Sequence, residues 1–121
     1  KKLSKDFGEG KIDKFKLRNL DKETAKQELI KLYGVGPETA RILLFEAYHH
    51  YDVFDHIAPW QQKIYSRLFY GKKLVSAKKI YNDIKKQYGK YSMLAVHYIW
   101  EDIFWKRTTQ NIPWLGKEIR I

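Results

Sequence analysis

The chain has 121 residues, of which 44% are apolar, so it is long enough to form one domain with a sizeable core. It contains no cysteine, which excludes disulfides, zinc–thiolate sites and cysteine-bound iron–sulfur clusters. No apolar run or signal-peptide pattern points to a membrane or secreted protein, so an intracellular location is expected. Its 24 lysines and arginines against 14 acidic residues leave a net charge of +10 and a pI near 9.7, which favours a polyanionic partner such as nucleic acid.

The N-terminal part of the chain predicts two helices separated by a tight turn. Residues 1–19 are polar and are expected to hold the end of a helix and a loop. Asp21 can cap the first helix of the pair, and Pro37 suits the first position of the second, where an N–H would be unpaired in any case. Between them, Gly34 and Gly36 permit backbone angles and close approaches that a Cβ would forbid. Apolar residues recur in the first helix at helical spacing, at Ala25, Leu29 and Leu32.

The turn between these two helices has the properties of an anion-binding site. The second helix begins with unpaired N–H groups and a partial positive charge, beside backbone that carries no side chain at two positions. Phosphate fits such a site well. The alternative is an ordinary corner between two helices, in which glycine serves the geometry of the turn alone.

Two helices are predicted around the segment that follows the turn. The second helix of the pair should extend over residues 38–48, and Pro59 opens a third helix that ends before Gly71. The residues expected to be buried in the helix over 38–48 are Ala40, Leu43, Leu44 and Ala47.

The C-terminal part of the chain predicts two more helices. Ser76 can cap a helix that stops at Gly89, and Ser92 can cap the last long helix, which is too apolar all round for an exposed position. Residues 108–121 are expected to be irregular or to form a short strand. Since no repeat or alternating strand pattern is present, we expect an all-α fold, with residues 1–121 forming a single helical domain.

The stretch Leu32–Ala40 reads Leu-x-Gly-Val-Gly-Pro-x-Thr-Ala and resembles the helix-hairpin-helix motif of the DNA glycosylase superfamily, which includes endonuclease III and the 3-methyladenine glycosylases. The resemblance covers roughly residues 20–68, with the hairpin motif at about residues 21–48. In that family the hairpin amides bind a DNA phosphate, often with a monovalent cation on the hairpin carbonyls. It implies that the residues of this chain that contact the phosphate are Gly34, Val35, Gly36 and Thr39.

Asp55 is the candidate catalytic residue. The family carries a catalytic aspartate a short loop beyond the second hairpin helix, and Asp55 follows Gly36 by 19 positions in a Val-Phe-Asp-His-Ile run that resembles the family's. Cleavage of an N-glycosidic bond builds positive charge on the deoxyribose, which a carboxylate can stabilise while it orients water. Two alternatives stay open: Asp55 caps the helix that Pro59 opens, or a turn before it, and Asp52 is the acid that acts.

Glu38 departs from the pattern of the bifunctional members of the family. Those members resemble endonuclease III and carry a lysine two residues past the second glycine, where it forms an imine with the sugar. A glutamate cannot form an imine, so the resemblance implies a monofunctional enzyme without lyase activity. The alternative role of Glu38 is structural, because an acid in the first helical turn interacts favourably with the helix dipole.

The expected substrate is an alkylated base that is flipped out of the duplex, since an aromatic pocket selects cationic bases by stacking and cation–π attraction. The candidate pocket residues are Glu38, Tyr48, Tyr51 and Trp60. Aromatic residues at helical spacing are more often core, which is the favoured interpretation for Trp60 and Tyr65. His49, His50 and His56 lack partners for a metal site, so no metal is expected. Seven lysines between residues 72 and 90, against one acid, form a dense basic zone.

We therefore expect a base-excision repair protein: a monofunctional DNA glycosylase that hydrolyses the N-glycosidic bond of a damaged, alkylated base in double-stranded DNA. The alternative is a non-catalytic helix-hairpin-helix module that binds DNA. The family's catalytic domain has several helices before the hairpin, so the chain is expected to be the C-terminal part of a longer glycosylase and to have little activity alone. A monomer without a cofactor, apart from the hairpin cation, is expected.

Overall fold

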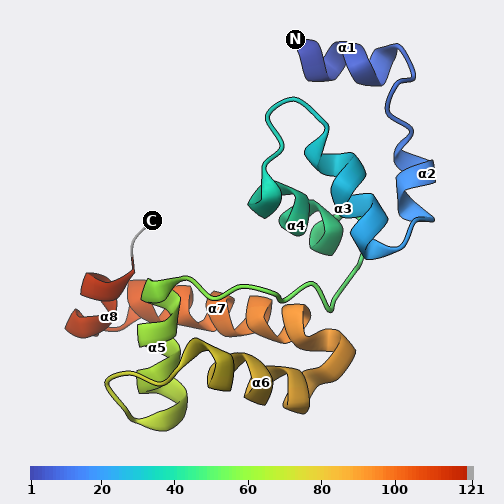
Figure 1. The fold of residues 1–121 in the computed structure, drawn as a ribbon. Helices are drawn as coiled ribbons and strands as arrows, with labels where there is room; N and C mark the ends of the chain where they lie inside the picture. Colours follow the sequence, from blue (N-terminus) through green and yellow to red (C-terminus); the bar gives the residue numbers. More distant parts are fainter. Residues whose placement is uncertain (120–121) are drawn as a thin grey trace. The chain divides into compact units, whose positions relative to one another are not determined.

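The computed structural model describes residues 1–119, apart from the side chain of Leu3, and this part of the chain is helical and contains no strand (Figure 1). The expectation of an all-α fold is confirmed to this extent. The helices are α1 (Lys2–Gly8), α2 (Lys14–Arg18), α3 (Lys22–Ile30), α4 (Pro37–Glu46), α5 (Pro59–Tyr70), α6 (Ala77–Tyr88), the 3-10 helix η1 (Gly89–Tyr91), α7 (Ser92–Thr109) and α8 (Pro113–Glu118).

The contacts between residues divide the chain into two compact units. Unit 1 comprises Lys1–Val53 and holds α1 to α4, and unit 2 begins at Phe54 and holds α5 to α8. The expectation of a single helical domain stays a prediction, because compact units of this size can belong to one domain. None of the helices in the described part of the chain combines the length and the apolar character that crossing a membrane requires.

Unit 1 is built around the pair formed by α3 and α4, which pack side by side (Figure 1). Ala25 and Leu29 of α3 and Ala40 and Leu44 of α4 are each at most 2% exposed, and small residues at two of these positions let the helices approach closely. Phe45 of α4 is buried as well. This pair places the turn between the two helices at its end, where it is exposed.

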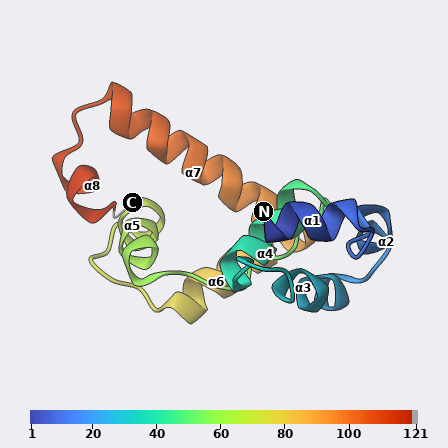
Figure 2. The same ribbon diagram turned by 90° about the horizontal axis from the view of Figure 1, so that it is seen from above.

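Unit 2 is held together by α5, α6, α7 and α8. Tyr65 of α5 is fully buried, and its hydroxyl accepts a hydrogen bond of 2.6 Å from Nε1 of Trp100 in α7. Ile80 of α6 and Leu115 of α8 add to the apolar core. Both views show α8 beside α5 (Figure 1 and Figure 2), in agreement with the contacts between these helices. The preference for Tyr65 as a core residue is confirmed.

Several local predictions are confirmed by the capping contacts. The Asp21 carboxylate accepts hydrogen bonds from the amides of Glu23 and Thr24, so it caps α3 as expected. Ser76 caps α6 by accepting a bond from Lys79 N–H. Pro37 and Pro59 each open their helix, and Gly71 ends α5 with a left-handed φ of 61°.

Other local predictions were wrong. Residues 1–19 form two short helices rather than one helix end and a loop, because the Asp13 side chain accepts bonds from two amides and begins α2. Ala47 is exposed, because α4 ends at Glu46 and leaves Ala47 beyond its packed face. Ser92 does not cap α7: it is the first residue of the helix and fully buried, and Tyr91 of the preceding 3-10 turn is the N-cap residue. The segment from 108 continues α7 and then forms α8 up to residue 118, where Pro113 opens the helix.

Candidate functional site

The turn between α3 and α4 depends on one glycine in a left-handed conformation. The N–H of Val35 donates a hydrogen bond of 3.1 Å to the carbonyl of Leu32, which closes a four-residue turn. Gly34, the third residue of this turn, has a φ of +82°, the value that a type II turn requires at that position and that side chains disfavour. The role of Gly34 in the turn, expected from the sequence, is therefore confirmed.

Gly36 has a different role, because its backbone is ordinary. It is the N-cap residue of α4, with a φ of −87° and a ψ of 175°, which any residue adopts. Its carbonyl accepts the first helical bond from Ala40 N–H at 2.9 Å. A Cβ added at Gly36 would meet no atom of the described chain within 4 Å. The turn itself does not require glycine here, so the bare backbone is available for close approach of a ligand.

The first turn of α4 presents donors to solvent. Pro37 occupies the first position without an N–H, and the amides of Glu38 and Thr39 follow it, before the first helical bond. Among the described residues, these two amides and that of Gly36 find no hydrogen-bond acceptor. All four residues are exposed. The helix therefore begins with exposed N–H donors at its positive end, an arrangement that favours anions.

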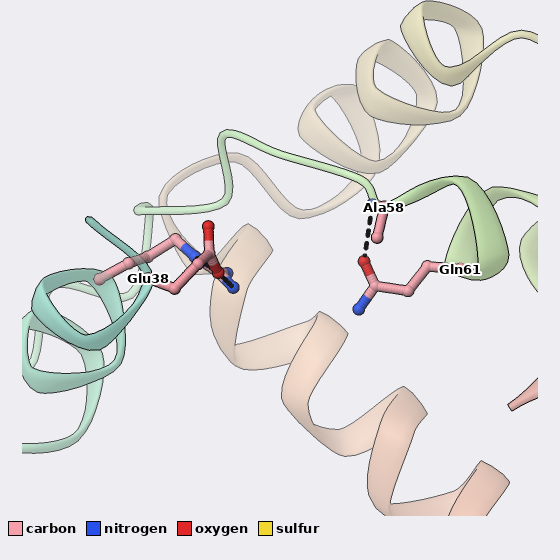
Figure 3. A network of polar contacts seen from close by, with 4 residues as sticks. Glu38, Ala58 and Gln61 are labelled. Atoms are coloured by element: carbon pink, nitrogen blue, oxygen red, sulfur yellow. Dashed lines mark hydrogen bonds and ion pairs between the residues drawn. The ribbon is translucent and has the colours of Figure 1, made fainter. Parts of the chain in front are cut away.

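Glu38 lies next to these donors and forms an ion pair with Arg41. Oε2 of Glu38 lies 2.6 Å from Nη2 of Arg41 and 3.2 Å from its Nε, one helical turn away (Figure 3). The Arg41 side chain is only 15% exposed, whereas that of Glu38 is 63% exposed. Glu38 lies in the first turn of α4, as the structural alternative requires, and the ion pair with Arg41 is a further structural contact that the sequence analysis did not predict. The guanidinium also offsets a negative charge that would otherwise repel an anion at the turn.

Asp52, the alternative to Asp55 as catalytic acid, has a structural partner. Its Oδ2 lies 2.6 Å from Nζ of Lys22, in the first turn of α3. The pair joins residues 30 positions apart and ties the end of unit 1 to the beginning of α3. This ion pair gives Asp52 a structural role within unit 1. The choice between Asp52 and Asp55 as the acid that acts stays a prediction.

Asp55 lies in the segment before α5, between two buried residues. Phe54 is 2% exposed and stacks on Tyr81 of α6, with ring centroids 5.6 Å apart, and Ile57 is 9% exposed. Asp55 and His56 are exposed between these anchors. The burial of Phe54 and Ile57 therefore leaves Asp55 and His56 exposed between them.

Asp55 is not the residue that caps α5. The N-cap residue is Ala58, and its amide donates a 2.9 Å hydrogen bond to Oε1 of Gln61, one turn into the helix (Figure 3). The interpretation of Asp55 as the cap of this helix was therefore wrong. The amide at the N-terminus of α5 is therefore paired with a side chain from within the helix. Gln61 at the third helical position is the residue in the sequence that could have predicted this cap.

Asp55 borders a shallow hollow of about 260 Å³ within unit 2. The residues that line it come from the segment before α5 and from the first two turns of α6: Asp55, His56, Ile57, Ala77, Lys78 and Tyr81. Lys78 and Tyr81 were not predicted to lie beside Asp55. Nothing in the spacing along the chain could have revealed this, because the packing of Phe54 on α6 brings them together.

The residues of the candidate base pocket belong to both units. In unit 1, Tyr51 packs edge-on against Phe45, and its hydroxyl lies 3.2 Å from Nδ1 of His49. Burial raises the pKa of Tyr48 above its ordinary value. In unit 2, the ring of Trp60 packs against Trp100 at 5.1 Å, as a core residue would. Glu38 is in unit 1. A shared pocket of these residues stays a prediction.

The described part of the chain holds no group of three or more histidine, aspartate or glutamate side chains arranged to bind a metal ion, and the absence of cysteine leaves no ligands for an iron–sulfur cluster. The monovalent cation at the hairpin stays a prediction. Comparison with protein-family models, with curated proteins and with solved structures finds no match for this chain.

Proposed function

We propose that this protein binds double-stranded DNA through the hairpin between α3 and α4 and that Asp55 makes it a monofunctional glycosylase of the helix-hairpin-helix type. The proposed substrate is a damaged, alkylated base. The observation that carries the proposal is the hairpin itself: a left-handed Gly34, an unstrained Gly36 and two exposed amides at a helix N-terminus. That arrangement suits a phosphate, and phosphate contacts position a protein on DNA without reading its sequence.

Asp55 would act on the sugar of the damaged nucleotide. As the bond between C1′ and the base nitrogen breaks, the electron pair leaves with the base and positive charge develops on the deoxyribose. The Asp55 carboxylate would stabilise that charge and orient the water that adds to C1′, with the released proton passing to the departing base or to solvent. The exposure of Asp55 between the buried residues Phe54 and Ile57 supports this role.

Glu38 supports the absence of lyase activity in this proposal. A carboxylate cannot form a Schiff base, so the reaction should end with an intact strand that carries an abasic site. Borohydride added during the reaction should trap no covalent protein–DNA adduct. A strong adduct would contradict the monofunctional assignment and indicate an amine nucleophile elsewhere in the chain.

The experiment that tests the proposal is a base-release assay on duplexes that each carry one lesion, in which alkali converts abasic sites to strand breaks. Asp55→Asn should abolish base release while DNA affinity stays equal or rises, because one negative charge near the phosphates is removed. The matched control is Asp52→Asn, which removes the same charge three residues away and should retain base release. Base release that survives in Asp55→Asn and disappears in Asp52→Asn would refute the assignment.

The alternative proposal is a non-catalytic DNA-binding module. It is supported by the fact that the hairpin, its two helices and their apolar contacts all lie in unit 1, so the grip does not need unit 2 for its own geometry. DNA binding that depends on Gly36, without base release from any lesion duplex, would favour this module over the glycosylase.

A further inference from the structure

Helix α6 has one basic side and one buried side. Ile80 and Ile84 are 0% and 5% exposed and face the core of unit 2. Lys78, Lys85 and Lys86 lie at positions i, i+7 and i+8, which places them along one face of a helix, away from the two isoleucines. Lys78 and Lys86 are exposed, and Lys85 is partly exposed. We refer to these three lysines as the lysine face.

Residues 72–90, which include α6, hold seven lysines and one acid. Asp83 is the acid between residues 72 and 90, and it lies beside the face, where Lys79 Nζ approaches its Oδ2 to 2.8 Å and the Tyr70 hydroxyl donates to the same oxygen at 2.6 Å. These hydrogen bonds, first that of Lys79 and then that of Tyr70, lower the pKa of Asp83. Lys85 and Lys86 are adjacent and Lys78 lies two turns before them, so a polyanion that contacts this face would reduce the repulsion among like charges.

The lysine face begins at the hollow beside Asp55. Lys78 lines that hollow together with Asp55, and Lys86 lies two turns further along α6. At a rise of about 1.5 Å per residue, the distance from Lys78 to Lys86 along the helix is roughly 12 Å. One strand of duplex DNA places a phosphate about every 3.4 Å along its axis, so this length corresponds to roughly three or four nucleotides.

We propose that the lysine face binds the phosphates of the lesion-bearing DNA strand on one side of the damaged nucleotide, and so places its sugar at Asp55. The inference rests on the proposed function, since Asp55 defines where the damaged nucleotide lies. It adds a second contact to the DNA backbone, made by unit 2, to the phosphate contact proposed for the hairpin. The contact reads charge and not base sequence, and it gives the bound strand a direction relative to Asp55.

The first test measures DNA affinity against salt for the full chain. The double variant Lys78→Gln/Lys86→Gln should bind a duplex with a stable abasic analogue about tenfold more weakly, and the slope of log affinity against log salt should fall by about two. The control Lys106→Gln/Lys117→Gln removes the same charge from α7 and α8 of unit 2 and should leave the slope close to that of the wild type. Equal losses in both double variants would overturn the proposal.

The second test removes charge from the DNA instead. Uncharged methylphosphonates replace three phosphates on one side of the abasic analogue, then the three on the other side. On one side the substitution should weaken binding of the wild type about tenfold, with little further loss in Lys78→Gln/Lys86→Gln, because the same contact is already gone. If the methylphosphonates on either side weaken DNA binding by the variant as much as by the wild type, the two losses add and the contact is refuted. A variant that binds DNA as tightly as the wild type would also refute it, and this is the result expected if the lysine face binds an acidic protein.

Two further arms keep the outcomes distinct. Lys78→Arg/Lys86→Arg preserves the charges and should restore the wild-type salt slope, and circular dichroism checks that all variants keep their helical content. If no lesion is excised but the phosphate coupling on one side persists, the glycosylase proposal fails and the DNA contact stands. If excision by Asp55 is confirmed and the coupling is absent, the lysine face fails and the proposed function stands.

Discussion

The sharpest prediction concerns Gly36→Ala, because the structure separates its effect on folding from its effect on a ligand. The added Cβ would meet no atom of the described chain within 4 Å, and the φ of −87° suits alanine. Alanine is a poorer N-cap residue than glycine, but it also restricts the unfolded chain, so the net change in the free energy of unfolding should stay within about 0.5 kcal/mol.

DNA binding should respond much more strongly than folding. An amide that donates to a phosphate oxygen needs a separation near 2.9 Å, and a methyl group on the same residue obstructs that approach. A hydrogen bond to a charged group contributes roughly 1.5–3 kcal/mol, so partial loss of this contact should weaken binding by about ten- to a hundredfold. The loss should be the same for duplexes of any sequence, because the contact is to the backbone.

The assay is fluorescence anisotropy with a labelled duplex, together with urea unfolding of each variant. Gly8→Ala is the matched control, since its Cβ would also meet nothing within 4 Å and its φ lies outside the left-handed region, but it is in α1 rather than in the hairpin. A Gly36→Ala protein that folds normally and binds DNA within about twofold of the wild type would refute the phosphate grip, since twofold is only about 0.4 kcal/mol.

Three predictions concern stability. Tyr65→Phe should lower the free energy of unfolding by about 1–3 kcal/mol in urea titrations, because it leaves the buried indole N–H from α7 unpaired; an unchanged midpoint would contradict this. Burial, and then Asp83, raise the pKa of Tyr70 to about 12. The wild type should therefore lose stability as pH rises from about 10 to 12, because the tyrosine ionises in the unfolded chain before it does in the folded one, and Tyr70→Phe should remove that part of the pH dependence. Hydrogen bonds from Thr24, that of its side chain first, lower the pKa of Asp21. The free energy of unfolding that the wild type gains over Asp21→Ala should be present above pH 4 and fade as pH falls below it. A gain that does not change with pH would refute the role of this cap.

Local capping chemistry could be predicted from the sequence because it acts within one helical turn. Asp21 and Ser76 bond to amides two or three residues away, and Pro37 and Pro59 begin helices by their fixed φ. Gly34 could be assigned to the turn for the same reason, since a left-handed φ is a property of that residue and its neighbours. The all-α architecture and the exposed hairpin follow from such local preferences.

The surroundings of the candidate acids depend on contacts that are distant in sequence. Asp52 pairs with Lys22 across 30 positions, and no local pattern encodes that pair. The hollow beside Asp55 exists because Phe54 stacks on Tyr81, which brings α6 to the segment before α5. Sequence spacing carries no information on such pairs, because they depend on which helical faces pack together.

Tertiary packing also overrode the sequence where a residue type suited two roles. Serine is a common N-cap residue, yet Ser92 is the buried first residue of α7, because the 3-10 turn before it leaves Tyr91 as the N-cap residue. The pairing of Tyr65 with Trp100 spans 35 positions and required both helices to be in place. The sequence by itself determined where α3, α4, α5 and α6 begin and where the hairpin turns, since these depend on neighbouring backbone groups. Only the tertiary structure decided which side chains meet, because burial rewards contacts between faces regardless of their separation along the chain.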